Sequence, residues 1–376
     1  MPRRWTAVLV ALLLAPLVRS QQEDTVLNKT LGEWLKILRT EKDVKWRRAS
    51  LIALEVYGPK KAGVVPGLLD ALEKDAEPTI RRETASTLGR MGPDAKGAID
   101  ALAVALKNDK SDVVREAAAR ALGGRMATQS HSQVLILGAA LGDAHAGTRT
   151  AAAETLRDLG EHARAVVPQL CEALADAKND RFTRTYVAQV LGRLKEDADK
   201  SAGVLATVVI DAAAPVAVRE AAADALGRLG ADSAIGNLAM ALSHKAKDKK
   251  DKTPETNPPE VRRAAALALA KFDDKAKGVW SVINAALRDP DSGVRYQVIR
   301  LAGRLGREVE EVVPNLVQIA AEDEVTENRL AAVQELGELG PVASRAVDGL
   351  SRLARDDTRS SVREAAQAAL KKIQGK

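Results

Sequence analysis

One stretch of this sequence occurs three times with small changes, and that repetition constrains the fold more than any other feature. VREAAADALGRLG covers residues 218–230, VREAAARALGG covers residues 114–124, and VREAAQAALKK covers residues 362–372. A helix of a globular domain gives no reason for two further copies along the same chain. A recurring motif of this kind is typical of proteins built by stacking similar units.

Aligning the chain on the arginine of this motif extends the repetition over most of its length. Ten anchor arginines result, separated by 33 to 35 residues except for one step of 43. Leucine stands seven residues after the anchor in nine of the ten units. A period between about 20 and 50 residues indicates a solenoid or an array of repeats. The anchors are Arg47, Arg81, Arg115, Arg149, Arg184, Arg219, Arg262, Arg295, Arg329 and Arg363.

Each unit is predicted to contain two helices. The second helix begins at the anchor. Its apolar residues lie one before the anchor and three, four, seven and ten after it, which places them on one helical stripe. Aspartates such as Asp43 and Asp180 precede these helices as N-caps, and glycines such as Gly58 and Gly230 follow them as stop residues. No segment alternates with the period of a strand, so the sequence predicts an all-α chain.

This pattern resembles the HEAT repeat, in particular the short form first associated with phycobilin lyases. The resemblance covers roughly residues 30–373. It implies an α-solenoid, an armadillo-like superhelix of about ten helix-turn-helix units over residues 30–376, with the second helices lining the inner face. It also implies that the ten anchors form a structural ladder with acidic residues of neighbouring turns. We favour this role over a track for a polyanion, because the anchors border the apolar stripe and buried charges need partners.

The N-terminus has a different character from the repeats. Residues 1–20 carry Arg3 and Arg4 ahead of an apolar run that is shorter than the roughly 20 residues of a membrane span. This pattern predicts a signal peptide cut near Gln21, a polar segment at 21–29, no membrane span in the mature chain, and a periplasmic or extracellular protein. Residues 1–20 hold three arginines and no acid, so without them the net charge falls from +6 to +3. Such a small positive charge argues against nucleic-acid binding.

Two places depart from the regular unit. The step of 43 residues contains a charged insert with two prolines at 244–260, which is predicted to be a solvated spacer loop. Trp34 and Trp46 lie in the first unit, where larger rings are expected to close an end that lacks a neighbouring repeat.

No group of residues points to catalysis, a metal or a cofactor. The four histidines are scattered, and none is followed by Glu, as in the His-Glu pairs of the HEAT-repeat enzyme deoxyhypusine hydroxylase. Cys171 lies in an apolar helical run and is predicted to be a core residue rather than a nucleophile. Gly-x-x-Gly strings such as GRLG at 227–230 close helix C-termini, where the negative end of the dipole disfavours phosphate. The sequence therefore predicts a protein that is not an enzyme.

The remaining prediction is a binding surface on the inner curve. Positions one, two, five and nine after the anchor point away from the apolar stripe, and the ninth position is basic in six of ten units. Cations near a helix C-terminus are favoured by the macrodipole whatever they face, so that alternative stays open. Tyrosine and arginine are common anchors of interfaces. We therefore predict contact with an acidic or extended protein partner for Tyr186, Arg193, Arg228, Tyr296, Arg300 and Arg304.

These observations favour one function over a second. The predicted function is a non-catalytic, exported scaffold that presents a concave helical surface to a protein or peptide. The alternative is a lyase-like or other enzyme-accessory protein with HEAT repeats. An extended concave surface is what a solenoid supplies, which favours the scaffold.

Overall fold

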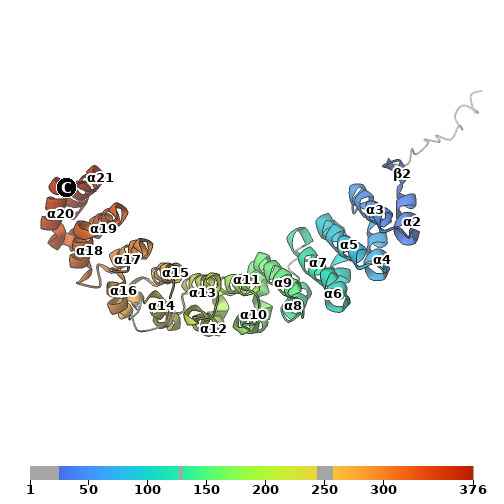
Figure 1. Cartoon of the computed structure of the whole chain (residues 1–376), viewed down its shortest axis with the longest axis horizontal. Helices are drawn as coiled ribbons and strands as arrows, with labels where there is room; N and C mark the ends of the chain where they lie inside the picture. The colour runs from blue at the N-terminus through green and yellow to red at the C-terminus, as the bar shows by residue number, and fades with distance from the viewer. Residues whose placement is uncertain (1–24, 127–129, 244–256, 376) are drawn as a thin grey trace, which may run out of the picture.

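The computed structural model describes residues 25–126, 130–243 and 257–375. In this part of the chain, twenty α-helices follow one another as ten pairs, and short 3-10 helices occupy several of the turns. The pairs stack side by side into a crescent, with one helix of each pair on the concave side and the other on the convex side (Figure 1). This arrangement confirms the predicted all-α solenoid of ten helical pairs.

The first helix of each pair lies on the convex side and is called the outer helix here (Figure 1). The outer helices are α2 (Leu31–Thr40), α4 (Val64–Lys74), α6 (Ala98–Asn108), α8 (His131–Ala140), α10 (Val167–Ala175), α12 (Ala198–Ile210), α14 (Ile235–Leu242), α16 (Trp280–Ala286), α18 (Val312–Glu322) and α20 (Val347–Asp356).

The second helix of each pair carries the anchor arginine and lines the concave side, as the resemblance implies (Figure 1). These inner helices are α3 (Val44–Tyr57), α5 (Pro78–Met91), α7 (Asp112–Ala121), α9 (Ala146–Leu159), α11 (Arg181–Leu191), α13 (Val216–Leu229), α15 (Pro259–Leu269), α17 (Ser292–Leu305), α19 (Thr326–Leu339) and α21 (Ser360–Gln374). The 3-10 helices are η1 (Gly92–Asp94), η2 (Gly124–Met126), η3 (Gly160–Val166), η4 (Lys195–Asp197), η5 (Asp232–Ala234), η6 (Asp273–Val279) and η7 (Gly340–Ala346).

The apolar stripe of each inner helix builds one continuous core along the crescent. In α13 the residues of this stripe are at most 8% exposed: Val218, Ala222, Ala223, Leu226 and Leu229. The stripe packs against the outer helices, so the opposite side of each inner helix is left to face the concave surface.

Local signals in the sequence set the ends of the inner helices. The Asp43 carboxylate accepts the Lys45 N–H at 2.8 Å, which satisfies one of the free donors at the start of α3. Gly230 ends α13 at a φ of 68°, in the left-handed region that favours glycine.

A small β-hairpin precedes the first helix, so the prediction of a chain without strands is wrong at this point. Strand β1 (Thr25–Val26) pairs antiparallel with β2 (Lys29–Thr30). Leu27 and Asn28 form the two-residue turn with φ of 50° and 61°, the backbone that tight hairpins require. Strands of two residues carry no periodic signal, which is why the sequence pattern missed them.

The hairpin and Trp34 close the N-terminal end of the core. Trp34 is 1% exposed, and its indole N–H donates to the Val26 carbonyl at 2.8 Å. Trp46 behaves differently, because it is 50% exposed. Trp46 occupies the position directly before the anchor. The residues at the same position of α5 and α13, Ile80 and Val218, are buried. Within the described residues no repeat packs over the Trp46 ring, so the expectation that Trp46 closes the end is wrong.

The insert predicted at 244–260 ends earlier than expected. Residues 244–256 lie outside the described residues, as do residues 1–24 with the predicted signal peptide. Asn257 is 8% exposed, and its amide donates to the backbone oxygens of Met240 and Ser243. Helix α15 already begins at Pro259. The last residues of the predicted loop are therefore part of the packed fold.

Candidate partner-binding surface

The anchor arginines join each unit to the next through the turns. Arg81 donates from Nε and Nη2 to the two carboxylate oxygens of Asp109, both at 2.8 Å, and from Nη1 to the backbone oxygen of Asp75 at 2.9 Å. The Asp75 carboxylate in turn binds Arg47 of the preceding unit. Each such aspartate thus holds two anchors. Among the described residues, six pairs have this form: Arg47–Asp75, Arg81–Asp109, Arg115–Asp143, Arg262–Asp289, Arg295–Asp323 and Arg329–Asp357.

These pairs favour the charged form of the carboxyl groups. Burial acts to raise the pKa of Asp323, but hydrogen bonds from the Arg295 guanidinium and the Val325 N–H outweigh it and the pKa is lowered. The pKa of Asp109 and that of Asp143 are lowered in the same way. The side chains of Arg295 and Asp323 are 10% and 4% exposed, so they are not presented to a partner.

The ladder changes in the middle of the chain. Arg149 donates to two backbone oxygens of its own turn, and Arg184 donates from Nε to the Leu174 carbonyl at 2.9 Å. Among the described residues, no carboxylate oxygen lies within 4.0 Å of either guanidinium group. The turn that would supply a partner for Arg149 runs from Asp176 over eight residues to the next anchor, against six in the regular turns. The longer turn therefore accompanies the absence of an arginine–aspartate pair at this interface.

Arg219 and Arg363 also bind backbone oxygens. Arg219 is 2% exposed and donates to the Val209 carbonyl at 3.0 Å and to the Asn257 side chain. Burial lowers the pKa of Arg219. Arg363 lies in the last unit and donates to the Asp357 carbonyl at 2.7 Å. A bond from the anchor to a backbone oxygen is therefore common to all ten units, whereas the bond to a carboxylate is not.

Other contacts join the units where the ladder is altered. The Thr150 hydroxyl lies 3.1 Å from an oxygen of Asp180 and 2.8 Å from the Thr183 hydroxyl. The Arg157 guanidinium lies over the Tyr186 ring, 4.5 Å from its centroid. A cation in this position is attracted by the electrons of the ring face. The interface between α9 and α11 thus uses a hydroxyl network and a stacked arginine instead of an ion pair.

Close contacts between glycine and small residues bring neighbouring inner helices together. A Cβ added to Gly192 of the α11–α13 interface would lie 2.6 Å from the Ala225 Cα, which is closer than real Cβ atoms approach. From the sequence, the glycines of the Gly-x-x-Gly strings are interpreted only as residues that end helices. The recurrence of glycine eight residues after the anchor is the sequence signal that indicates this close packing. Most partners are small residues at position six of the next unit, and Glu335 is the exception. The pairs are Gly89–Ala121, Gly123–Thr155, Gly192–Ala225, Gly227–Ala268, Gly303–Glu335 and Gly337–Ala369.

The six predicted contact residues fall into two groups on the inner helices. Tyr186 lies on α11, Arg193 lies two residues after the end of α11, and Arg228 lies on α13. The second group consists of three residues of α17, namely Tyr296, Arg300 and Arg304. Helix α15 separates the two groups along the chain, so the structure does not bring all six into one cluster.

The three arginines at position nine all have partners within the chain. Arg193 donates to the backbone oxygen of Arg157 at 2.9 Å, and Arg304 donates to that of Ala270 at 3.0 Å. Both oxygens belong to the end of the preceding inner helix, where the dipole is negative. Arg228 donates to Asp224 within its own helix at 2.7 Å. The macrodipole alternative considered above therefore accounts for where Arg193 and Arg304 lie, although all three side chains remain exposed.

The two predicted tyrosines differ in access. Tyr186 is half-buried against the core and lies under the Arg157 guanidinium, whereas Tyr296 is 38% exposed. Arg300 of the same helix as Tyr296 forms an ion pair with Glu335 at 2.8 Å. Burial raises the pKa of Glu335, and Arg300 opposes that rise. Tyr296 is therefore the better-presented of the two rings.

The residues weighed as a possible nucleophile or as metal ligands do not form such a site among the described residues. Cys171 is half-buried, its Sγ lies 3.8 Å from the Lys200 carbonyl oxygen, and burial raises the pKa of the thiol. Among the described residues, no group of three His, Cys, Asp or Glu side chains is arranged to hold a metal ion. In the same part of the chain, no helix combines the length and apolar character needed to cross a bilayer.

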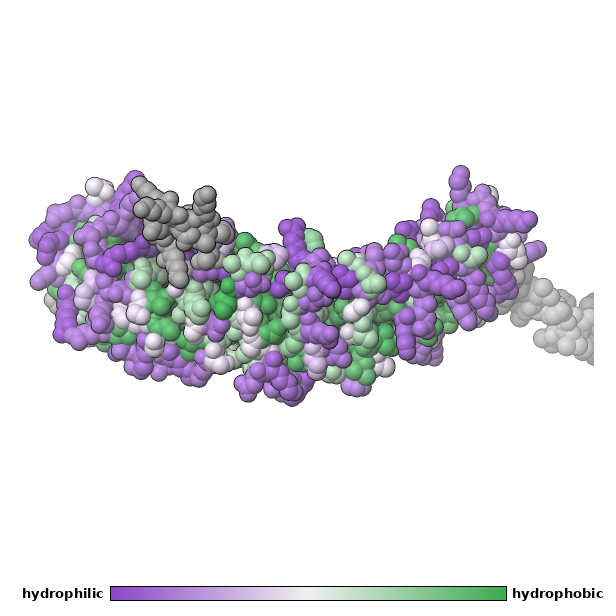
Figure 2. Space-filling model, turned by 60° about the horizontal axis from the view of Figure 1, so that its bottom comes forward, coloured by the Kyte–Doolittle hydropathy of each residue, from purple (hydrophilic) through white to green (hydrophobic). Residues whose placement is uncertain are grey.

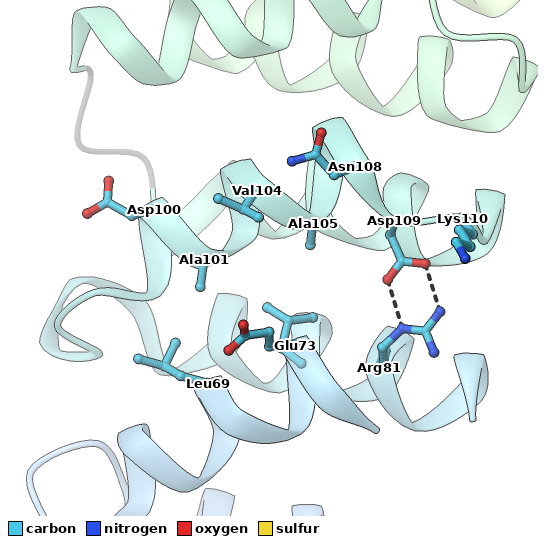
Figure 3. A pocket seen from close by; sticks show the side chains of 11 residues that line it. Leu69, Glu73, Arg81, Asp100, Ala101, Val104, Ala105, Asn108, Asp109 and Lys110 are labelled. Carbon is cyan, nitrogen blue, oxygen red and sulfur yellow. Dashed lines mark hydrogen bonds and ion pairs between the residues drawn. The ribbon is translucent and has the colours of Figure 1, made fainter. Parts of the chain in front are cut away.

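Grooves open between neighbouring outer helices on the convex side. Figure 3 shows one of about 590 Å³ between α4 and α6, where Leu69 and Glu73 lie opposite Ala101 and Ala105. The Arg81–Asp109 pair marks one end of this groove. Similar grooves lie between α2 and α4, between α16 and α18, and between α18 and α20. They recur because the outer helices spread apart on the convex side of a curved stack. This recurrence favours a consequence of curvature over a single built site.

The convex side carries exposed apolar side chains, mainly in the middle of the molecule. Figure 2 turns this side forward and shows hydrophilic residues over both ends and more hydrophobic residues between them. Leu135 of α8 and Met240 of α14 contribute to this side and are 42% and 58% exposed. Single exposed apolar residues are normal on a protein surface. We therefore place the candidate site on the concave side, where arginine and tyrosine occur together.

Comparison with family models decides the identity of the repeats. Residues 31–123, 99–192 and 281–371 match the HEAT repeats model, and together these segments cover more than half of the chain. The protein belongs to the HEAT-repeat family. Residues 218–244 also match the PBS lyase HEAT-like repeat, which agrees with the short form of the repeat seen in the sequence. No curated protein matches the chain in sequence.

Solved structures with the same fold include natural and engineered solenoids. An engineered protein is 18% identical, with a TM-score of 0.52 and coverage of 92% of this chain and 98% of the other. Kap121p is 15% identical, with a TM-score of 0.54 and 91% of this chain covered. The karyopherin Kap121p bound to the extreme C-terminus of the protein phosphatase Cdc14p is 14% identical, with a TM-score of 0.55 and 99% of this chain covered. The HEAT-repeat chain spans 45% and 49% of these two Kap121p chains. At such low identity the likeness describes the fold alone.

Proposed function

We propose that this HEAT-repeat protein is an exported, non-catalytic scaffold that holds a protein or peptide partner along its concave face. The observation that carries the proposal is the row of inner helices with exposed arginines and Tyr296 on a continuous curved surface. Solenoids use such extended concave surfaces for binding. Kap121p, which has the same fold, has been solved bound to Nup53p, and this supports binding of a protein partner without identifying it.

The proposed contact residues are the six predicted from the sequence, with two adjustments. The Arg157 guanidinium covers one face of the Tyr186 ring, so only part of this ring is available to a partner. Arg193 and Arg304 already bond one backbone oxygen each and offer their remaining N–H groups. The match of residues 218–244 to a lyase-like repeat spans one unit, and a repeat can serve many functions, so it adds no catalytic role.

Site-specific photo-crosslinking tests the scaffold. A crosslinking amino acid is placed at Gln189 of α11 and Gln334 of α19, which are exposed positions five residues after their anchors. Matched controls stand at Val104 and Met240 on the convex side, both 58% exposed. We expect the concave positions to capture a common protein from the native source and the convex positions to capture none of it. Equal capture from both sides would contradict the concave surface as the binding site.

Export is tested separately by mass spectrometry of the protein from each cell fraction. We expect a mature chain that starts near Gln21 in the periplasm or medium. Intact Met1 on the soluble cytoplasmic protein would overturn the proposal of export.

A further inference from the structure

Two neighbouring inner helices, α15 and α17, carry equivalent stripes of exposed side chains. Positions one, five and nine after the anchor are four residues apart, so they follow one line along the helix, although the ninth position of the α15 unit, Lys271, lies just past the helix end at Leu269. None of the six positions in these two units is acidic. The six residues, named here the α15–α17 patch, are Arg263, Leu267, Lys271, Tyr296, Arg300 and Arg304.

The α15–α17 patch combines exposed apolar groups with exposed cations. Leu267 is 50% exposed and Tyr296 is 38% exposed. The side chains of Lys271 and Arg300 are 42% and 47% exposed. Apolar surface set among cations is costly to leave in water and suits a partner that brings both an apolar group and negative charge.

Three of the four cations in the α15–α17 patch have a carboxylate partner, and the fourth has none among the described residues. Arg300 pairs with Glu335 at 2.8 Å. Lys271 pairs with Asp224, but Asp224 also accepts Arg228. The nearest carboxylate oxygen of Glu260 is 3.8 Å from Arg263, and the pair is exposed. Arg304 bonds a backbone oxygen rather than a carboxylate.

The equivalent stripes of the first two units provide a contrast. They are also basic, and Ile52 and Val56 are exposed beside them. There, however, Arg90 binds both oxygens of Glu55 at 2.7 and 2.6 Å, and Glu83 accepts both Arg48 and Arg82. Cations held by their own carboxylates have less to offer a partner. The α15–α17 patch differs in Arg304, whose guanidinium has no carboxylate oxygen within 4.0 Å among the described residues and bonds a backbone oxygen instead.

Resting on the scaffold function proposed above, we propose that the α15–α17 patch binds a short acidic segment of a partner protein in extended conformation. One apolar side chain of the segment packs between Leu267 and Tyr296, and carboxylates on either side of it bind the four cations of the patch, Arg263 and Arg304 among them. Eight residues of helix span about 12 Å at about 1.5 Å per residue. Packed helices lie about 10 Å apart. An extended peptide rises about 3.3 Å per residue, so about four residues of the segment fill the patch.

The limited extent of the positive charge favours an acidic peptide over a nucleic acid. The stripe of α13 contains Glu220 and Asp224, and the stripe of α19 contains Glu338. These acids flank the α15–α17 patch on both sides. A polynucleotide needs a basic groove that follows several successive phosphates, and its affinity comes mainly from them.

The test uses the full-length protein and an array of fluorescent eight-residue peptides in which two to four acids flank one Leu, Phe or Tyr. Affinity is measured by fluorescence polarisation. The test variant is Arg263→Gln with Arg304→Gln, and the matched control is Arg82→Gln with Arg90→Gln, at the same two positions of α5. Arg300 is left in place because it supports the buried Glu335. A third variant, Leu267→Ser, removes the apolar contact, and thermal melting checks each fold.

We expect saturable binding that is about tenfold weaker in the test variant, because two charge-assisted contacts are lost. Leu267→Ser is expected to weaken it about fivefold, and the control by less than about twofold. The proposal would be overturned if the test variant and the control lost affinity equally, or if peptides without the apolar residue bound equally well. Tighter binding of single-stranded RNA, or no peptide binding at all, would also overturn it. If a partner that crosslinks at the concave face binds these variants with unchanged affinity, this inference is overturned but the proposed scaffold function is not.

Discussion

The two outer parts of the molecule and its middle join their repeats by different bonds. In the outer parts an anchor such as Arg81 or Arg295 holds both oxygens of an aspartate in the next unit. In the middle, between α9 and α13, Arg149 and Arg184 hold backbone oxygens, and within the described residues no carboxylate lies within 4.0 Å of them. The anchor itself is present in both regions.

This difference separates two roles of the same arginine. The bond to a backbone oxygen fixes the turn inside a unit and is made by all ten anchors. The bond to a carboxylate links one unit to the next and is replaced in the middle by contacts such as Thr150–Asp180 and Arg157–Tyr186. Since each repeat of a solenoid contacts only its neighbours, such exchanges can occur at one interface without disturbing the others.

The largest effect is expected from breaking a regular pair. Asp323→Ala leaves the buried Arg295 guanidinium without its main carboxylate and should cost about 3 kcal/mol of local stability. Hydrogen exchange of the α17 and α19 amides measures this loss, since a long repeat array need not unfold in one step. Asp323→Asn keeps an acceptor and should lose less. A change below about 1 kcal/mol for Asp323→Ala would show that the pair is not a structural link.

The second effect concerns the close contact that the middle retains. Gly192→Ala places a Cβ 2.6 Å from the Ala225 backbone, so α11 and α13 must move apart at a cost of about 1–3 kcal/mol. Gly203→Ala on the outer helix α12 meets no atom within 4 Å and should gain about 0.5–1 kcal/mol from helix propensity. The two melting temperatures should therefore shift in opposite directions. Shifts of the same sign would contradict the close packing.

A smaller effect is expected when an anchor is removed from the middle. Arg184→Met breaks no pair with a carboxylate and loses one bond to the Leu174 carbonyl, so it should cost about 1 kcal/mol. Arg295→Met, the matched change in the outer part, leaves the Asp323 carboxylate buried and should cost about 3 kcal/mol. Equal costs in denaturant titrations followed by regional hydrogen exchange would remove the distinction between the two regions.

Mild acid should produce the smallest and most distributed difference. The pKa of Asp109, Asp143 and Asp323 is lower in the folded protein than the ordinary value near about 4. Their contribution is therefore complete above that ordinary value and is lost as the pH falls through the lowered folded pKa. Amides of α5–α7 and α17–α19 should lose protection as the pH falls below about 4 more than those of α13 and α14. Helices α11 and α12 do not serve for this comparison, because the pKa of Asp180 and that of Asp197 are also lowered at their starts. Uniform loss along the chain would contradict this expectation.

The sequence by itself determined the number of units, the pairing of helices and the side of each inner helix that faces the core. These features depend on short-range periodicity: an apolar stripe, an N-cap such as Asp43 and a stop glycine such as Gly230 act within one helix and its neighbouring turn. The same stripe also predicted which positions remain open on the concave side. The hairpin at Thr25–Thr30 escaped prediction because its strands are too short to carry a period.

Only the tertiary structure decided which anchors meet a carboxylate and which concave side chains keep free donors. Asp176 and Asp211 follow their outer helices as the regular ladder aspartates do, yet Arg149 and Arg184 are not paired with them. Arg304 finds its partner 34 residues away. Such pairs depend on the path of a turn and on how two units stack, to within an ångström or so, whereas a sequence pattern specifies only which residues share a face.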